Sequence, residues 1–146
     1  MSVPPGPLVF VHIAGAFLLG IVAPLPIAAA PLVRQVGFGL SAIGLLLGLI
    51  AVIEFQRTRM RARREGVKLR LVTTGIYRWT RNPVYLGFVV MLVGVTLFRG
   101  NFWGVALAPV LVLMMNWLVI GPEETELAER CKEEFVEYRA RVRRWL

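Results

Sequence analysis

The residues of this chain with the clearest chemical potential are the acidic pair Glu123-Glu124 and the motif Asn82-Pro83-Val84-Tyr85. The chain has one His, one Cys and no Asp. These counts exclude a Ser-His-Asp triad, a zinc site of Cys and His ligands, and an internal disulfide. The chemistry that remains is that of carboxylates, which pair with cations or accept protons. We therefore expect no metal site, and the two motifs need helices that bring them together.

Long stretches without charge separate the polar segments. The first 33 residues carry no charged side chain, and three later gaps hold 19, 17 and 23 residues. A membrane-spanning helix needs about 20 apolar residues. The pattern predicts an all-α, polytopic membrane protein that forms a single domain over residues 1–146. Its four transmembrane helices are expected near residues 8–30, 36–55, 83–98 and 102–120.

The first predicted span is the least regular. Pro24, Pro26 and Pro31 remove backbone hydrogen-bond donors from its second half. We expect this helix to kink, or to stop near Ala23 and continue as irregular chain. A cleaved signal peptide is the alternative, which the missing basic start disfavours.

The basic residues are concentrated in two segments. Nine of the 17 Lys and Arg lie in residues 57–81 and six in residues 121–146, which leaves Arg34 and Arg99 for the other connections. Because connections rich in Lys and Arg stay in the cytoplasm, we predict a multi-pass protein with a basic cytoplasmic loop and both termini cytoplasmic. This topology and anionic lipid headgroups account for the formal net charge of +8 and disfavour nucleic-acid binding.

The short link Arg99-Gly100-Asn101 joins the third and fourth spans and forces an antiparallel hairpin. Because the two arms are similar in length, residues 80–85 and residues 120–124 meet at one membrane level. A carboxylate pair at the edge of hydrocarbon is costly without a cation nearby. Each motif alone also has a structural interpretation, as a helix start or as the acidic first turn of a helix. Their convergence favours a functional site.

Small residues recur along the second predicted span. They stand at spacings of four and three, at Gly37, Ser41, Gly44 and Gly48. Gly87 and Gly94 are similar candidates on the third span. This spacing predicts close packing between helices rather than chemistry.

After Glu123 the chain predicts one amphipathic cytoplasmic helix over residues 123–145. Its apolar residues recur at steps of three and four and form one stripe: Leu127, Cys131, Phe135, Tyr138, Val142 and Trp145. We expect this helix to lie along the cytoplasmic face or to fold back over the ends of the hairpin as a lid. The structural alternative is a simple membrane-surface anchor.

Two segments resemble the signatures of a known superfamily, that of the isoprenylcysteine carboxyl methyltransferases and phospholipid methyltransferases. Residues 71–87, LVTTGIYRWTRNPVYLG, resemble its first signature, L-V-T-x-G-x-Y-x-x-x-R-[HN]-P-x-Y-x-G. The second signature, E-E-x-x-L-x-x-x-F-G-x-x-Y-x-x-Y, resembles the segment that contains Glu123, Glu124, Leu127, Phe135 and Tyr138. The resemblance covers about residues 40–146.

The resemblance implies an integral-membrane enzyme that binds S-adenosylmethionine at the cytoplasmic end of the hairpin and methylates a lipophilic acceptor in the bilayer. The cofactor contacts of the family fall on Leu69, Arg70, Leu71, Val72, Tyr77, Asn82, Pro83, Val84, Tyr85, Glu123 and Glu124. Arg81 is a further candidate, because an arginine binds a cofactor carboxylate or a lipid phosphate through paired hydrogen bonds. Glu124 is the candidate catalytic residue, which would accept a proton from an amine acceptor.

The sequence departs from the family pattern at several positions. Asn82 stands where the prenylcysteine enzymes have His, Cys131-Lys132 replaces Phe-Gly, and Phe135 replaces the first Tyr of the second signature. Val119 stands where the prenylcysteine enzymes have an Arg that binds the substrate carboxylate. A lipid amine or another small apolar acceptor is therefore favoured over a prenylcysteine carboxylate.

Two other functions stay open at the level of the sequence. One is a non-catalytic small membrane protein for assembly or lipid binding. The other is a membrane reductase of the sterol-reductase type, which shares a similar C-terminal pattern and uses a nicotinamide cofactor. A methyltransferase binds S-adenosylhomocysteine and ignores NADPH, so a binding comparison separates these functions.

Overall fold

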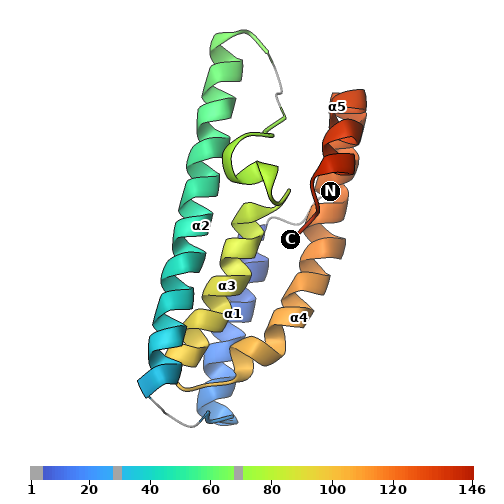
Figure 1. Cartoon of the computed structure of the whole chain (residues 1–146). Helices are drawn as coiled ribbons and strands as arrows, with labels where there is room; N and C mark the ends of the chain where they lie inside the picture. Colours follow the sequence, from blue (N-terminus) through green and yellow to red (C-terminus); the bar gives the residue numbers. More distant parts are fainter. Residues whose placement is uncertain (1–4, 28–30, 68–70) are drawn as a thin grey trace.

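The computed structural model describes residues 5–27, 31–67 and 71–146, and in these ranges the chain is helical without a strand. This confirms the predicted all-α fold class. The helices form an elongated bundle (Figure 1). The elements are α1 (Pro5–Val22), α2 (Pro31–Arg64), the 3₁₀ helix η1 (Gly75–Arg78), α3 (Pro83–Phe98), α4 (Trp103–Met115), the π-helix η2 (Asn116–Ile120) and α5 (Gly121–Arg141).

The first helix is shorter than predicted. α1 ends at Val22, so residues 8–30 do not form one helix, and the expected stop near Ala23 is the correct alternative. Prolines that follow cannot donate the hydrogen bonds of a further turn. The irregular segment pairs instead with the connection between α3 and α4, where Ile27 N–H donates to Gly100 O at 3.1 Å and Phe102 N–H donates to Leu25 O at 3.0 Å.

The second helix is longer than its predicted span of residues 36–55. α2 has 34 residues, which corresponds to a length of about 51 Å, against roughly 30 Å for the hydrocarbon of a bilayer. The prediction of a loop from residue 57 is wrong for residues 57–64, which continue the helix. Arginine and methionine are good helix formers, and no Gly or Pro occurs between Gly48 and Gly66.

Apolar helices make up most of the bundle. Pro31–Arg64 and Trp103–Arg141 are long and apolar enough to cross a membrane, and Gly6–Val22 and Pro83–Phe98 are shorter apolar helices. Large apolar side chains are exposed on several of them, among them Phe10, Phe38 and Trp117. A surface of this kind is typical of helices that contact lipid.

α2 and α3 pack through their backbones. A Cβ added to Gly44 would lie 2.5 Å from Met91 N, and one added to Gly94 would lie 2.4 Å from Ser41 N. A Cβ on Gly87 would meet Gly44 O at 2.7 Å. Only glycine fits at these distances, which confirms the predicted close packing. We call the contact formed by Gly37, Ser41, Gly44, Gly87 and Gly94 the glycine seam.

The second arm of the hairpin continues into α5 without an interruption. α4, η2 and the part of α5 before Lys132 form one helical stretch that begins at Trp103. In η2 the helix widens, and Gly121 N–H donates to Asn116 O. Pro122 explains this local change, because it lacks an N–H and its ring crowds the carbonyl four residues earlier. The wider turn keeps the chain helical, so Glu123 and Glu124 follow directly from the apolar arm.

α5 is not the straight helix predicted over residues 123–145. It ends at Arg141, and Lys132 interrupts it with φ 43° and ψ −118°. Glu124 and Arg144, 20 residues apart, would be separated by about 30 Å along a straight helix, yet their side chains form an ion pair. The chain therefore folds back at Lys132. We call residues 133–146 the C-terminal arm.

The fold-back brings the apolar stripe of the sequence, except Trp145, into one cluster between its own two halves. Phe135 and Tyr138 form a buried cluster with Leu71, and the partly buried side chains around it are Leu127, Ala128, Cys131 and Val142. The C-terminal arm thus packs on the first half of α5 and on the segment that precedes η1.

Candidate functional site

A cavity of about 610 Å³ lies at the end of the bundle where α2, the segment before α3 and α5 meet. These segments lie far apart in the sequence and come together at the upper end of the molecule in Figure 1. Most of the lining is apolar, with Phe55 and Val52 from α2 and Phe88 from α3. The charged groups come mainly from the start of α5. We call this space the site cavity.

The site cavity brings together the residues predicted from the two signatures. Ten of the twelve predicted positions line it: Leu71, Val72, Tyr77, Arg81, Asn82, Pro83, Val84, Tyr85, Glu123 and Glu124. The other two, Leu69 and Arg70, lie outside the described residues. The hairpin thus places both motifs around one space.

Tyr85 and Glu123 form the direct contact between the two arms of the hairpin. The hydroxyl of Tyr85 donates to both carboxylate oxygens of Glu123, at 2.9 and 3.1 Å. Glu123 follows the apolar arm, and its burial raises the pKa of its carboxyl; the Tyr85 hydrogen bond opposes this shift and the charge of Glu126 adds to it. Among the described residues, no cation pairs with Glu123.

Two tyrosines join the remaining walls of the site cavity. Tyr138 donates its hydroxyl proton to Tyr77 O at 2.7 Å, and the hydroxyl of Tyr77 donates to Ala51 O at 3.4 Å. Burial raises the pKa of each of these tyrosines to about 12, and the charge of Glu123 contributes at Tyr77. Both hydroxyls are therefore neutral donors at physiological pH. They connect the C-terminal arm, η1 and α2.

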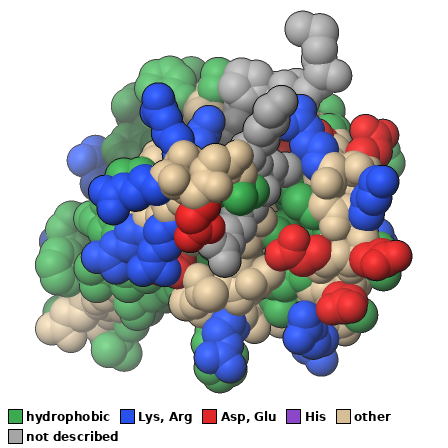
Figure 2. Space-filling model, turned by 90° about the horizontal axis from the view of Figure 1, so that it is seen from above, with side chains coloured by type: hydrophobic (Ala, Val, Ile, Leu, Met, Phe, Trp, Pro, Cys, Tyr) green, Lys and Arg blue, Asp and Glu red, His purple; other side chains and the backbone are tan. Residues whose placement is uncertain are grey.

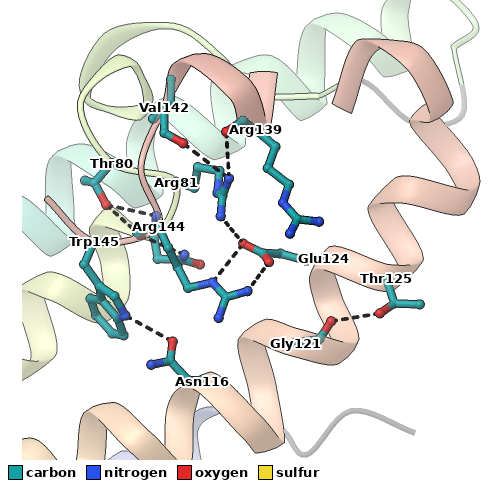
Figure 3. A network of polar contacts seen from close by, with 11 residues as sticks. Thr80, Arg81, Asn116, Gly121, Glu124, Thr125, Arg139, Val142, Arg144 and Trp145 are labelled. Carbon is teal, nitrogen blue, oxygen red and sulfur yellow. Dashed lines mark hydrogen bonds and ion pairs between the residues drawn. The ribbon is translucent and has the colours of Figure 1, made fainter. Parts of the chain in front are cut away.

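Glu124 has a different environment from its neighbour. Its side chain is only 10% exposed and forms ion pairs with two arginines (Figure 3). Arg81 Nη2 lies 2.9 Å from Glu124 Oε1. Arg144 reaches both oxygens, with Nε 3.2 Å from Oε1 and Nη2 in contact with Oε2. Arg81 Nη1 also donates to Arg139 O and Val142 O, at 3.2 and 3.3 Å. The acid at this position is thus fully engaged with protein groups.

Asn82 precedes the first residue of α3, as predicted for a helix start, but its side chain makes no capping hydrogen bond. Its amide Nδ2 donates instead to Arg144 O at 3.0 Å. Thr80 Oγ1 donates to the same carbonyl at 3.1 Å. These two side chains therefore bind the backbone of the C-terminal arm instead of capping the start of α3.

Sequence reasoning missed several residues around the site cavity. Val52 and Phe55 lie three residues apart on α2, and helix periodicity allows such a face but does not say where it points. Gly6 belongs to the N-terminal part, which the family resemblance does not cover. Arg144 and its contact with Glu124 have no local signal, because the partner lies 20 residues away across a fold-back.

Charges are divided between two sides of the site end. In Figure 2, basic side chains gather over the upper end of α2, and most acidic side chains gather over α5 on the opposite side. The arginines of residues 57–64 are exposed near the end of α2, and Glu126, Glu129 and Glu133 are exposed on α5. The two sides flank the segments that form the site cavity.

Comparison with known protein families shows to which family this chain is related. The sequence model of the phospholipid methyltransferase family matches residues 33–133. This chain belongs to the phospholipid methyltransferase family. The match extends from α2 into α5. The matched segment of this phospholipid methyltransferase family member includes every residue that lines the site cavity except Gly6, Phe135 and Tyr138.

Two similar curated proteins are named protein-S-isoprenylcysteine O-methyltransferase. The protein of Saccharomyces cerevisiae is 36% identical over 76 residues, and that of Schizosaccharomyces pombe is 32% identical over 72 residues. Each match covers 49% of this chain and 30% of the relative, so the chain spans less than a third of their length in the matched region. An uncharacterized protein of Haemophilus influenzae is 33% identical over 63 residues, 43% of this chain and 100% of that protein. No solved structure matches the chain.

Proposed function

We propose that this chain is an integral-membrane methyltransferase that transfers a methyl group from S-adenosylmethionine to a lipophilic acceptor. The observation that carries the proposal is Glu123, a partly buried carboxylate that lines an apolar cavity and pairs with no cation among the described residues. An acid in that position suits a ligand that brings its own positive charge. Family membership and the yeast relatives support the reaction class.

The lining of the site cavity fits the cofactor, which supplies a methyl group on a cationic sulfonium. Glu123 would hold the ammonium group or the ribose hydroxyls, and the rings of Tyr77 and Tyr85 would shield positive charge. Arg81 Nε is buried without a hydrogen-bond partner among the described residues, so it would suit a carboxylate. The proposed cofactor set is Leu69, Arg70, Leu71, Val72, Tyr77, Arg81, Asn82, Pro83, Val84, Tyr85, Glu123 and Glu124.

The two acids of the pair are proposed to have different roles. Glu124 was the predicted proton acceptor, but it already forms an ion pair with Arg81 and accepts hydrogen bonds from Arg144 at both oxygens. Glu123 has only the Tyr85 hydroxyl as a described hydrogen-bond partner. Burial raises its pKa, which favours proton uptake. We therefore propose Glu123 as the acid that faces the ligands and Glu124 as an acid that fixes the arginines around them.

Positioning is the main catalytic task proposed for the protein. Transfer of an activated methyl group is an in-line displacement that depends on holding the reacting atoms in contact and in line. The hairpin and the glycine seam supply rigid walls, and the apolar lining excludes water from the reacting groups. No metal or covalent nucleophile enters this scheme.

The charge around the site cavity supports an acceptor without negative charge. Its described lining holds two arginines and three glutamates, a formal net charge of −1. Val119, which replaces the carboxylate-binding arginine of the prenylcysteine pattern, is fully buried in the core and does not line the cavity. Arg81 and Arg144 do approach the site, but both are paired with Glu124. We propose a lipid amine as the leading acceptor.

The proposed topology has four spans with both termini in the cytoplasm. The apolar character of α1, α2, α3 and α4 and the basic residues at the site end support it. The acceptor would then reach the site cavity from the bilayer and the cofactor from the cytosol. A cysteine probe at Gly100 should react with an external reagent, whereas one at Gly66 should not; the reverse pattern would contradict this orientation.

Binding measurements test the cofactor proposal. The purified protein in detergent should bind S-adenosylhomocysteine in calorimetry and should not bind NADPH. Glu123→Gln should weaken that binding about tenfold or more, because a charge-assisted hydrogen bond contributes about 1.5–3 kcal/mol. The matched control is Glu129→Gln, an exposed acid of the same helix that does not line the cavity. Wild-type affinity in Glu123→Gln would reject the assignment of Glu123.

The acceptor is tested by direct competition. Labelled S-adenosylmethionine is given to the protein with phosphatidylethanolamine and a farnesylcysteine analogue in the same bilayer. We expect label on the amine lipid. Label on the farnesylcysteine carboxylate alone would disprove the acceptor proposal and leave the cofactor proposal intact.

A further inference from the structure

The last five residues, 142–146, contact the wall of the site cavity on its outer side. None of them lines the site cavity, yet their carbonyl groups accept hydrogen bonds from residues just before α3. Arg81 N–H donates to Arg143 O at 3.0 Å, and Asn82 Nδ2 donates to Arg144 O at 3.0 Å. We call residues 142–146 the tail.

The side chains of the tail contact the opposite arm of the hairpin. The guanidinium of Arg144 pairs with Glu124 in α5 through two of its nitrogens. Trp145 Nε1 donates to Asn116 Oδ1 in η2 at 3.0 Å, and its ring packs against the main apolar core. The tail is therefore bound to both motifs that surround the site cavity.

Arg144 connects the two walls within a single residue. Its carbonyl accepts a hydrogen bond from Asn82 on the α3 side. Its guanidinium binds Glu124 on the α5 side (Figure 3). Asn82 and Glu124 both line the site cavity, and Glu124 in turn holds Arg81. A forked pair between arginine and carboxylate fixes direction as well as distance.

We infer that Arg144 is a positioning residue, which sets the separation of Asn82 and Glu124 and thereby the orientation of Arg81 toward the ligand. The inference rests on the proposed function for the identity of the ligand but not for the geometry. Without the Arg144 side chain, Glu124 keeps one of its two cationic partners and the tail loses its ion pair with α5. The two walls of the site cavity that carry Asn82 and Glu124 are then no longer held at a fixed separation.

The test compares Arg144→Ala with Arg143→Ala. The control removes the same charge from the same tail, but the Arg143 side chain is exposed and only its carbonyl makes a described contact. We expect Arg144→Ala to weaken S-adenosylhomocysteine binding at least tenfold and to speed hydrogen exchange at the Arg81 amide. Arg143→Ala should match the wild type in both measurements.

A second set of variants separates positioning from stability. Arg144→Lys should be intermediate, because an ammonium group cannot form the forked pair, and it replaces Arg144→Ala if that variant does not fold. Arg144→Ala combined with Glu124→Gln should bind no more weakly than the weaker single variant, since both act through one contact. Arg144→Ala combined with Glu123→Gln should give additive losses.

Equal exchange rates and equal affinities in Arg144→Ala and Arg143→Ala would overturn the inference. A lowered melting temperature with wild-type affinity of the folded protein would also overturn it, because that result describes a purely structural tail. If the wild type itself does not bind S-adenosylhomocysteine, the proposed function fails. The exchange rate of the Arg81 amide then decides whether Arg144 holds the wall.

Discussion

The glycine seam and the C-terminal arm hold different walls of the site cavity by different means. At the seam, α2 and α3 touch through backbone atoms with no charged group involved. The arm is held by the Arg81–Glu124–Arg144 pairs, by carbonyl acceptors and by one residue with an unusual backbone angle. The first wall is fixed by shape and the second by charge. The two walls should therefore respond to different perturbations.

The largest expected effect is the loss of the buried acid of the arm. Glu124→Ala leaves Arg81, whose side chain is 9% exposed, without its carboxylate. Breaking a buried ion pair from one side costs about 3–5 kcal/mol of the free energy of unfolding. Denaturant unfolding in detergent measures this change in the free energy of unfolding. Glu133→Ala, on the exposed side of the arm, should change stability by less than about 0.5 kcal/mol.

A smaller loss is expected at the glycine seam. In Gly44→Ala the new methyl group would lie 2.5 Å from Met91 N, so the helices must separate. Overpacking of this kind costs about 1–3 kcal/mol. Gly39→Ala on the same helix meets no atom within 4 Å and should gain up to about 1 kcal/mol from helix propensity. Melting temperatures that fall equally in the two variants would show that the seam is not the critical contact.

A gain is expected at the point where α5 folds back. Lys132 has a φ of 43°, which a side chain disfavours and glycine adopts freely. Lys132→Gly should stabilise the fold by about 1 kcal/mol. Lys132→Ala is the matched control, because it removes the charge but retains the Cβ, and it should give no such gain. A destabilised Lys132→Gly in the same unfolding measurement would mean that Lys132 itself anchors the arm.

The smallest effect concerns alkaline pH. The pKa of Tyr77 and of Tyr138 is raised from 10.0 to about 12 in the folded protein. A raised folded-state pKa gives stability that is complete below pH 10 and is lost as the pH rises toward 12. The melting temperature should fall in that range, and less steeply in Tyr138→Phe. An unchanged slope in Tyr138→Phe would assign the loss to other groups.

The sequence predicted the parts of the molecule that depend on local patterns. Charge-free gaps located the apolar helices, and the spacing of Gly37, Ser41 and Gly44 located the seam. The short link between α3 and α4 was sufficient to bring Tyr85 and Glu123 into contact. These features follow from helix periodicity and chain length, which are visible in one sequence.

The features that were not predicted depend on long-range partners. The apolar periodicity of residues 123–145 continues through Lys132, and a lysine does not indicate a turn, so the fold-back was not predicted. The family pattern quoted above has Gly at this position. Arg144 reads as one more basic residue of a helix, and its role arises only after the chain reverses. The separate environments of Glu123 and Glu124, adjacent in the sequence, likewise depend on which side of α5 each one faces.

The continuous helical stretch from Trp103 through η2 to Glu123 has a mechanical consequence for the proposed membrane enzyme. From Trp103 to Glu123 the helix rises by about 30 Å, which equals the thickness of the hydrocarbon in a typical bilayer. In the proposed four-span topology this stretch would cross the bilayer, with the hairpin link at one surface and the acids of the site at the other. In that topology a thinner bilayer would tilt the helix and shift Glu123 sideways. The geometry of the proposed site would in this way depend on the lipid composition of the membrane.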